Sequence, residues 1–268
     1  MIYTAVTGAA GRMGAAIINA LAGNTQIQLS GALERDDSPV LGKDAGEIAG
    51  TEKTGIKITN DRIKAFKKAE VIIDFSTPDV TMRTLEEAVE LKKAVVIGTT
   101  GFSLHQRDLI KELSHKTRVV MAPNMSIGVN LLLKLVADAA SVIGHEYDIE
   151  IIEAHHRHKK DAPSGTAIRI AEVIATTLNR DLEKVAVYER KGIVGERRPE
   201  EIGIQSIRAG DIVGDHTIIF GGIGERIELT HKASSRDTFA MGAVKAAIWV
   251  VNKPNGLYDM QDVLGLKG

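Results

Sequence analysis

The chain contains no cysteine among its 268 residues. Disulfide scaffolds, thiolate zinc sites, iron–sulfur clusters and cysteine nucleophiles are therefore excluded. Aromatic residues make up only 4% of the sequence, which disfavours a surface that stacks the bases of single-stranded nucleic acid. Neither sign of charge is in excess, because 34 Lys and Arg residues stand against 35 Asp and Glu residues. A net charge of -1 provides no basic field, so we expect no nucleic-acid partner.

Long apolar runs and a targeting segment are also missing from the sequence. No run approaches the roughly 18 apolar residues that a membrane-spanning helix needs. Residues 1–8 lack a basic region and soon reach a glycine, unlike a secretory signal. We therefore expect a cytoplasmic protein without a membrane partner. Hydrophobic residues still make up 44% of the chain, which suffices to bury a core without disulfides.

The first half of the chain alternates short β-rich runs with segments of helical spacing. The pattern predicts strands over 2–7, 27–33, 71–75, 94–98 and 118–122, and helices over 12–21, 80–91 and 104–114. The run at 71–75 is mostly apolar, as expected for a strand that is buried on both faces. This order of elements predicts an α/β fold with a doubly wound parallel sheet and helices on both faces.

The second half of the chain, beyond about 124–130, has a different pattern. Segments 148–153, 202–208 and 226–231 alternate polar and apolar residues, which indicates a sheet with one packed and one exposed face. Helices are predicted over 131–143, 167–178 and 239–251. Patterning alone does not decide whether the last of these helices belongs to the first or to the second domain.

A glycine-rich turn joins the first predicted strand to the first predicted helix. Gly8, Gly11 and Gly14 lie three residues apart, a variant of the G-x-G-x-x-G dinucleotide fingerprint. Such a turn lets backbone amides approach a pyrophosphate at a helix N-terminus, although a turn that binds nothing is the alternative. Glu34, 20 residues after Gly14, can accept a hydrogen bond from the ribose of NAD. Arg35 beside it suits the 2′-phosphate of NADP or is a solvated charge, so the two together predict use of both NADH and NADPH.

Three further loops follow predicted strands of the same sheet, at residues 76–78, 98–101 and 122–125. Ligands of doubly wound sheets bind outside the carboxyl ends of the strands, where these loops must lie. Their small polar residues allow a ribose or a nicotinamide ring to approach closely. Ordinary turn chemistry is the alternative for any one of the loops.

The densest chemistry lies in residues 153–167, EAHHRHKKDAPSGTA, in which three histidines and three cations occupy six consecutive positions. A metal site is one interpretation, but the cations would repel a dication, and we expect no metal. A solvated charged loop is another. An anion-binding, proton-donating site explains the segment better, since histidine and lysine transfer protons and cations bind carboxylates. Thr166 and the amides of the helix that follows form a second anion cradle, which predicts a small dicarboxylate substrate.

The segment 153–167 and the glycine turn resemble those of the 4-hydroxy-tetrahydrodipicolinate reductase (dihydrodipicolinate reductase) family of lysine and diaminopimelate biosynthesis. Residues 74–77, 98–101, 122–128 and 210–216 extend the resemblance over the chain. It implies an N-terminal Rossmann domain for NAD(P)H over 1–126 and 239–268. A C-terminal mixed α/β domain for substrate binding and tetramerisation is implied over 127–238, within a homotetramer. The implied reaction loses the 4-hydroxyl as water, adds hydride at C4 and adds a proton at C3.

The resemblance also implies roles for individual residues. His155 would be the catalytic acid/base and Lys159 the proton donor. The substrate carboxylates would be held by His156, Lys159, Gly165 and Thr166. The cofactor would be bound by Gly8, Ala9, Ala10, Gly11, Arg12, Met13, Glu34, Arg35, Gly98, Thr99, Thr100, Ala122, Pro123, Asn124 and Met125. Many relatives have Phe in place of Met125, and some have an apolar residue in place of Lys160, so cofactor preference and substrate affinity do not follow from the resemblance.

Two other functions fit parts of the sequence. A different nicotinamide-dependent dehydrogenase on the same architecture would carry its catalytic group elsewhere and would lack the cations before the Pro-Ser-Gly-Thr turn. A non-catalytic NAD(P) sensor would need the glycine turn and Glu34, but not both His155 and Lys159. Because function resides in the site rather than in the fold, the presence of both groups favours the enzyme.

Overall fold

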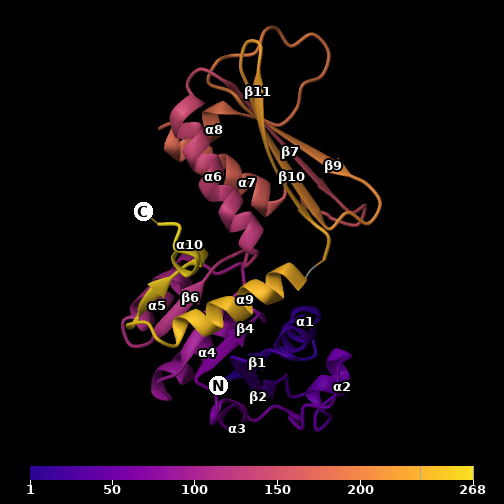
Figure 1. The fold of residues 1–268 in the computed structure, drawn as a ribbon, viewed down its shortest axis with the longest axis vertical. Helices are drawn as coiled ribbons and strands as arrows, with labels where there is room; N and C mark the ends of the chain where they lie inside the picture. The colour runs from indigo at the N-terminus through magenta and orange to yellow at the C-terminus, as the bar shows by residue number, and fades with distance from the viewer. Residues whose placement is uncertain (236, 268) are drawn as a thin grey trace. The chain divides into compact units, whose positions relative to one another are not determined.

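A computed structural model describes residues 1–235 and 237–267 (Figure 1). The chain forms two compact units, which are treated separately below. The first unit contains Met1–Ile127 and the C-terminal residues from 237 on, and the second contains Gly128–Ser235. Within the described ranges, no helix is both long enough and apolar enough to cross a membrane.

The first unit is built on a parallel sheet that has seven strands among the described residues. Their order across the sheet is β12-β6-β5-β4-β1-β2-β3. From β1 the chain builds one half of the sheet through β2 and β3 and the other half through β4, β5 and β6. The order of the strands therefore reverses between β1 and β4, as at the switch point of a doubly wound sheet. The strands are β1 (Ile2–Thr7), β2 (Ile27–Leu33), β3 (Ile58–Thr59), β4 (Val71–Asp74), β5 (Ala94–Ile97), β6 (Arg118–Met121) and β12 (Gly256–Tyr258).

Helices cover both faces of this sheet. Ile73 of β4 belongs to a core that includes residues of α1 and α9, whereas its neighbour Ile72 belongs to a second core with Phe66, Leu85 and Ile110. Successive side chains of one strand thus enter opposite cores, which explains why the run 71–74 carries no exposed position. The helices are α1 (Arg12–Leu21), α2 (Ala45–Ala49), α3 (Arg62–Phe66), α4 (Pro78–Glu90), α5 (Leu104–Ser114), α9 (Asp237–Val250) and α10 (Met260–Leu264).

The second unit contains a mixed sheet of order β11-β10-β7-β9-β8, counted over the part of the chain that the structure describes. β10 runs antiparallel to β7 and β11, whereas β7, β9 and β8 run parallel. Helices α6 and α7 share one core with the sheet. The elements are α6 (Ile127–Ile143), β7 (Asp148–His155), α7 (Gly165–Thr177), α8 (Leu182–Val185), β8 (Ala186–Val187), β9 (Ile202–Arg208), β10 (Gly214–Gly221) and β11 (Arg226–Ala233).

The predicted fold class is confirmed, with differences at particular elements. Three strands end one residue earlier than predicted, and α6 begins at Ile127 rather than at residue 131. Strand β10, an inner strand of the second sheet, was not predicted. Its inward positions begin with Gly214 and His216, so the sequence lacks the apolar alternation that marks a half-buried strand. The elements β3, β8, β12, α2, α3, α8 and α10 are too short for periodicity to reveal them.

Helix α9 settles the question that patterning left open, because it belongs to the first unit. It contacts β4, β5 and β6, and its buried residues are mostly alanines that allow a close approach to the sheet. Gly242 lies against the loop after β6: a Cβ added there would be 1.8 Å from the carbonyl oxygen of Met125. Glycine at this position therefore sets the distance between α9 and the loop 122–125.

We predict that Gly242→Ala destabilises the first unit. Alanine favours the helical backbone by about 1 kcal/mol, but the clash is with backbone atoms that must shift, at a cost of about 1–3 kcal/mol. Unfolding in urea can be followed through Trp249, the single tryptophan of the chain, which lies on α9. Gly256→Ala is the control, since its new Cβ would lie 3.4 Å from its nearest neighbour. Equal midpoints for the two variants would contradict the close packing at Gly242.

Candidate active site

The glycine turn begins directly after β1 and leads into α1. Gly8 has a φ of 64°, a backbone conformation that residues other than glycine rarely adopt. A Cβ at Gly14 would lie 2.1 Å from the carbonyl oxygen of Gly8, so the first turn of α1 packs directly on the loop. Gly11 occupies the N-cap position of α1 and has no side chain to cover the first amides of the helix. This geometry fits a pyrophosphate, which binds to exposed amides at a helix N-terminus.

The end of β2 brings Glu34 to the glycine turn. The Ala10 amide donates a hydrogen bond to the Glu34 carboxylate at 2.9 Å, and the Ala9 amide donates to the carbonyl of Leu33 at 3.1 Å. The predicted ribose acceptor and the predicted pyrophosphate loop are therefore adjacent. The Arg35 side chain is 73% exposed and pairs with Asp37 at 3.0 Å. Of the other turn residues, Ala9 is buried, Met13 is half-buried and Arg12 is exposed.

The loops after β4 and β5 are tied together by Asp74, a fully buried residue that sequence reasoning gave no role. Its Oδ1 accepts hydrogen bonds from the hydroxyls of Ser76 at 2.6 Å, Thr81 at 2.9 Å and Thr99 at 3.2 Å. The loop 98–100 is thereby fixed beside the loop 76–78. The sequence signal that could have revealed Asp74 is a carboxylate at the end of an otherwise apolar strand.

The loop after β6 contains the predicted residues Ala122, Pro123, Asn124 and Met125. The Ala122 amide donates to the carbonyl of Ile97 at 3.2 Å, and Asn124 Oδ1 accepts from the Ser126 amide at 2.9 Å. The Met125 side chain is buried in the core of the first unit. Because β1, β2, β4, β5 and β6 are parallel, all the predicted cofactor loops lie at the same carboxyl edge of the sheet.

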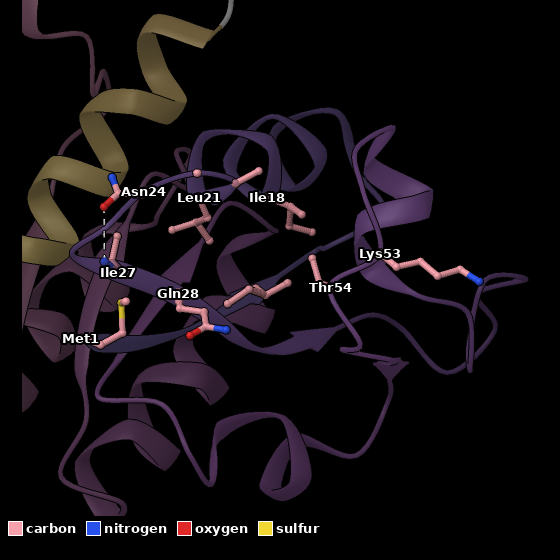
Figure 2. Close-up of a pocket in the computed structure, with 11 residues that line it drawn as sticks. Met1, Ile18, Leu21, Asn24, Ile27, Gln28, Lys53 and Thr54 are labelled. Carbon is pink, nitrogen blue, oxygen red and sulfur yellow. Dashed lines mark hydrogen bonds between the residues drawn. The ribbon is translucent and has the colours of Figure 1, made fainter.

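A cavity of about 320 Å³ lies in the first unit, but it is not at this edge (Figure 2). It is lined by residues at the end of α1 and at the start of β1 and β2, among them Met1, Leu21 and Ile27. The charged residue of its lining, Lys53, extends away from the other lining side chains and pairs with Glu47 at 3.2 Å (Figure 2). The cavity contains none of the predicted site residues.

In the second unit, β7 ends in Glu153-Ala154-His155, which places both polar side chains on the same face of the strand. The Glu153 side chain is fully buried, and Arg208 of the neighbouring strand β9 binds it with two hydrogen bonds of 2.9 and 2.8 Å. His155 Nδ1 lies 2.6 Å from Glu153 Oε2. Burial alone raises the pKa of this carboxyl, but the hydrogen bonds, with Arg208 first, outweigh burial and lower the pKa to about 2. Glu153 is therefore ionised at neutral pH.

His216 of β10 lies next to His155, with a ring-centroid separation of 5.3 Å. Burial, and after it the neighbouring His155 ring, lowers the pKa of His216 to about 4, so the His216 ring is neutral at neutral pH. Its Nε2 lies 3.0 Å from the hydroxyl of Ser164, which in turn accepts a hydrogen bond from the Ala167 amide and caps α7. Sequence reasoning missed His216 and Arg208, because they reach the site through strand pairing rather than local spacing.

The predicted substrate-binding residues lie between β7 and the first turn of α7. The Lys159 ammonium contacts both carboxylate oxygens of Asp161, at 3.0 and 2.9 Å, and this contact lowers the pKa of Asp161. Gly165 is the first residue of α7, and Thr166, the next, is half-buried. His156 immediately follows β7. Among residues 1–235 and 237–267, no three His, Asp or Glu side chains are grouped as metal ligands.

The similarity between this chain and known proteins extends over its full length. The profile described as "Dihydrodipicolinate reductase, N-terminus" matches residues 2–125, and "Dihydrodipicolinate reductase, C-terminus" matches residues 128–264. A 4-hydroxy-tetrahydrodipicolinate reductase of Syntrophotalea carbinolica is 53% identical, and one of Syntrophus aciditrophicus is 52% identical, each over 100% of both chains.

A solved structure supports the same assignment. Dipicolinate-bound dihydrodipicolinate reductase from Paenisporosarcina sp. TG-14 is 27% identical to this chain, with a TM-score of 0.77, and the similarity covers 98% of each chain. The resemblance seen in the sequence is thus confirmed by sequence and by structure. With both family profiles matched and relatives more than half identical along its entire length, the chain belongs to the dihydrodipicolinate reductase family of oxidoreductases.

Proposed function

We propose that the chain reduces 4-hydroxy-tetrahydrodipicolinate to tetrahydrodipicolinate, with NAD(P)H as reductant and with loss of water, in lysine and diaminopimelate biosynthesis. The observation that carries this function is the site at the end of β7. There His155 and Lys159, two groups that transfer protons, lie in the segment that leads to the first amides of α7. The dipicolinate held by the relative is a planar dicarboxylate, which supports a small dicarboxylate as the substrate here.

We assign dinucleotide binding to the first unit. The amides of Gly8, Ala9, Ala10, Gly11, Arg12 and Met13 would hold the pyrophosphate. The loops Gly98–Thr100 and Ala122–Met125 would border the nicotinamide, although the buried Met125 would do so through its backbone. When bound, the cofactor supplies the hydride that the substrate takes up at C4. Glu34 would bind the ribose hydroxyls of NADH and Arg35 the 2′-phosphate of NADPH, which supports use of both cofactors.

We assign substrate binding and proton transfer to the second unit. His156, Lys159, Gly165 and Thr166 would hold the two carboxylates through positive charge and the amides of the first turn of α7. Lys159 would leave Asp161 to reach the substrate and would act as the proton donor. His155 would act as the acid/base group. Cations at this site also stabilise the charge that develops on the substrate when hydride and proton arrive at different carbons.

The second unit would also build a homotetramer in the cytoplasm. Ile152, Ile207 and Ile219 alternate along their strands with the residues that enter the core, so they lie on the opposite face of the sheet and are partly exposed. The face also carries Glu150 and Thr217, but a sheet face with several partly exposed isoleucines is typical of a surface that binds another protein. A second copy of the same unit would cover it.

The direct test of the function is oxidation of NADH and NADPH by the purified protein, with the substrate generated in situ from pyruvate and aspartate semialdehyde by the preceding synthase. Rapid oxidation that depends on the protein is expected, and the two rates measure cofactor preference. Failure to oxidise either cofactor, although the protein binds them, would overturn the proposal in favour of another dehydrogenase or of the sensor.

Replacing Lys159 with Ala should lower kcat about 10²- to 10⁴-fold, the usual contribution of a general acid, because the proton donor is lost. The affinity for NADH, measured by fluorescence titration, should not change, since the assigned cofactor residues belong to the first unit. Lys160→Ala removes the same charge one residue later, from an exposed side chain, and is the matched control. If the two variants lose kcat to the same extent, Lys159 contributes only positive charge.

Replacing Glu34 with Ala should weaken the binding of NADH more than the binding of NADPH. A lost hydrogen bond to a charged group costs about 1.5–3 kcal/mol, roughly a tenfold loss of affinity or more. Because Glu34 also holds the Ala10 amide, part of the loss will be common to both cofactors. The difference between the two dissociation constants isolates the ribose contact, and Arg35→Ala should show the opposite preference. Equal losses of affinity for NADH and for NADPH would show that Glu34 does not bind the ribose.

A further inference from the structure

Glu153 occupies a position that the proposed catalytic scheme does not explain. Its Oε2 faces His155 Nδ1 at 2.6 Å, and its Oε1 accepts a hydrogen bond from the Ser164 amide at 3.1 Å. The Arg208 guanidinium spans both oxygens. A buried carboxylate is costly unless it is paired and hydrogen-bonded, and here each oxygen has two partners. Such a complete arrangement at the end of β7 suggests a role beyond packing.

The first consequence concerns the protons of His155. An ionised carboxylate can only accept, so the Nδ1 that faces Glu153 must carry its hydrogen in both the neutral and the positive form of the ring. The proton that the ring exchanges is therefore the one on Nε2. This atom faces Gly214 of β10, where a Cβ would lie only 3.0 Å from it. Glycine at that position keeps the Nε2 side of the ring open.

The second consequence concerns the substrate cradle. The Ser164 amide is held by Glu153, and the Ser164 hydroxyl caps α7. The next two residues are Gly165 and Thr166, which we assigned to the substrate carboxylates. One carboxylate thus fixes both the ring of His155 and the start of the helix that would bind the substrate anion.

We propose that Glu153 is a positioning residue for the reduction: it holds His155 as the Nδ1–H form with Nε2 available for proton transfer, and it aligns the start of α7 with that ring. The inference rests on the proposed function, because it gives His155 the acid/base role. Arg208 keeps Glu153 ionised. The charged and titratable groups around His155 are Glu153 on β7, Arg208 on β9, His216 on β10, and Lys159 and Asp161 on the loop.

The main variant is Glu153→Gln, which keeps the shape of the side chain and removes its charge. We expect kcat to fall at least about tenfold, towards the 10²-fold or more that an acid/base group contributes. The limb of the kcat/KM profile that reports the acid/base group should move to lower pH, because the carboxylate no longer stabilises the positive charge that the ring takes up. Affinity for NADH should stay the same. An unchanged kcat with an unmoved profile would overturn the proposal.

A double variant separates positioning from simple support of the fold. Glu153→Gln alone removes the charge partner of the half-buried Arg208, which can destabilise the unit. Glu153→Gln combined with Arg208→Gln removes both charges together. If Glu153 served only to balance Arg208, the double variant would regain kcat and the wild-type pH profile. If Glu153 positions His155, the folded double variant stays slow and keeps the shifted limb.

The unmodified protein provides a readout that needs no folded variant of Glu153. In ¹⁵N spectra of histidine-labelled protein, assigned by the signals lost in His155→Ala, neutral His155 should show a protonated Nδ1 and an unprotonated Nε2. The opposite tautomer would overturn the proposal. The same His155→Ala protein distinguishes the acid/base role of His155 from its positioning by Glu153. Normal turnover in it would disprove the acid/base role of His155, whereas lost turnover beside a normal Glu153→Gln enzyme would disprove only the positioning by Glu153.

Discussion

The charge pair between the buried Glu153 and the half-buried Arg208 is the constraint on which the second unit's site depends. A carboxylate without exposed surface must have its charge and its hydrogen bonds satisfied inside the protein. Arg208 satisfies it from the adjacent strand, which requires β7 and β9 to pair in the register that places residue 208 beside residue 155. Once that register is set, the remaining lone pairs of Glu153 reach His155 and Ser164. The geometry of the proposed acid/base group therefore follows from the requirement to neutralise a buried charge.

The first unit uses a buried carboxylate differently. Asp74, at the end of β4, is bound by three hydroxyl groups and a backbone amide rather than by a cation. Neutral donors hold the loops after β4 and β5 in place without adding a positive charge beside the carboxyl edge of the sheet. In both units an acid at the carboxyl end of a central strand organises the loops around it. The partners differ because one acid adjoins His155, the proposed acid/base group, and the other adjoins loops that need only to be positioned.

Much of this organisation is local in the sequence and was predictable from it. The strand Ile2–Thr7 and the helix Leu104–Ser114 have the predicted bounds, because a glycine follows the strand and a capping serine precedes the helix. The strand Ile27–Leu33 also has the predicted bounds. The proximity of Glu34 to the glycine turn followed from its spacing after Gly14. The place of α9 did not follow from patterning, since an alanine-rich helix suits the core of either unit, and only the family resemblance implied that it belongs to the first.

The contacts that complete the candidate site are non-local. Arg208 meets Glu153 across 55 residues, and Ser164 meets His216 across 52. No spacing rule connects such pairs, because they depend on the order and register of strands. Strand β10, which supplies His216, escaped prediction for a related reason: a glycine and a histidine fill inward positions that are usually apolar. The residues most specific to the site are thus the ones that weaken the sequence pattern of the fold.

The ion pairs of the two units differ in solvent exposure. Pairs with an exposed carboxylate can be broken by a ligand, whereas the pair of the buried Glu153 has to stay intact. Arg35 with Asp37 and Lys159 with Asp161 are pairs whose carboxylates are 76% and 65% exposed. Exposed pairs contribute only about 0–1 kcal/mol, so a phosphate or a substrate carboxylate can replace either aspartate at little cost. The Glu153–Arg208 pair has a carboxylate with no exposed surface, and breaking it would leave an unpaired buried charge. Ligand binding can therefore rearrange the two cations that we propose to bind anions while the carboxylate behind His155 stays fixed. The proposed acid/base group would have to keep its orientation while its surroundings adapt to the ligand, and this division of burial meets both requirements.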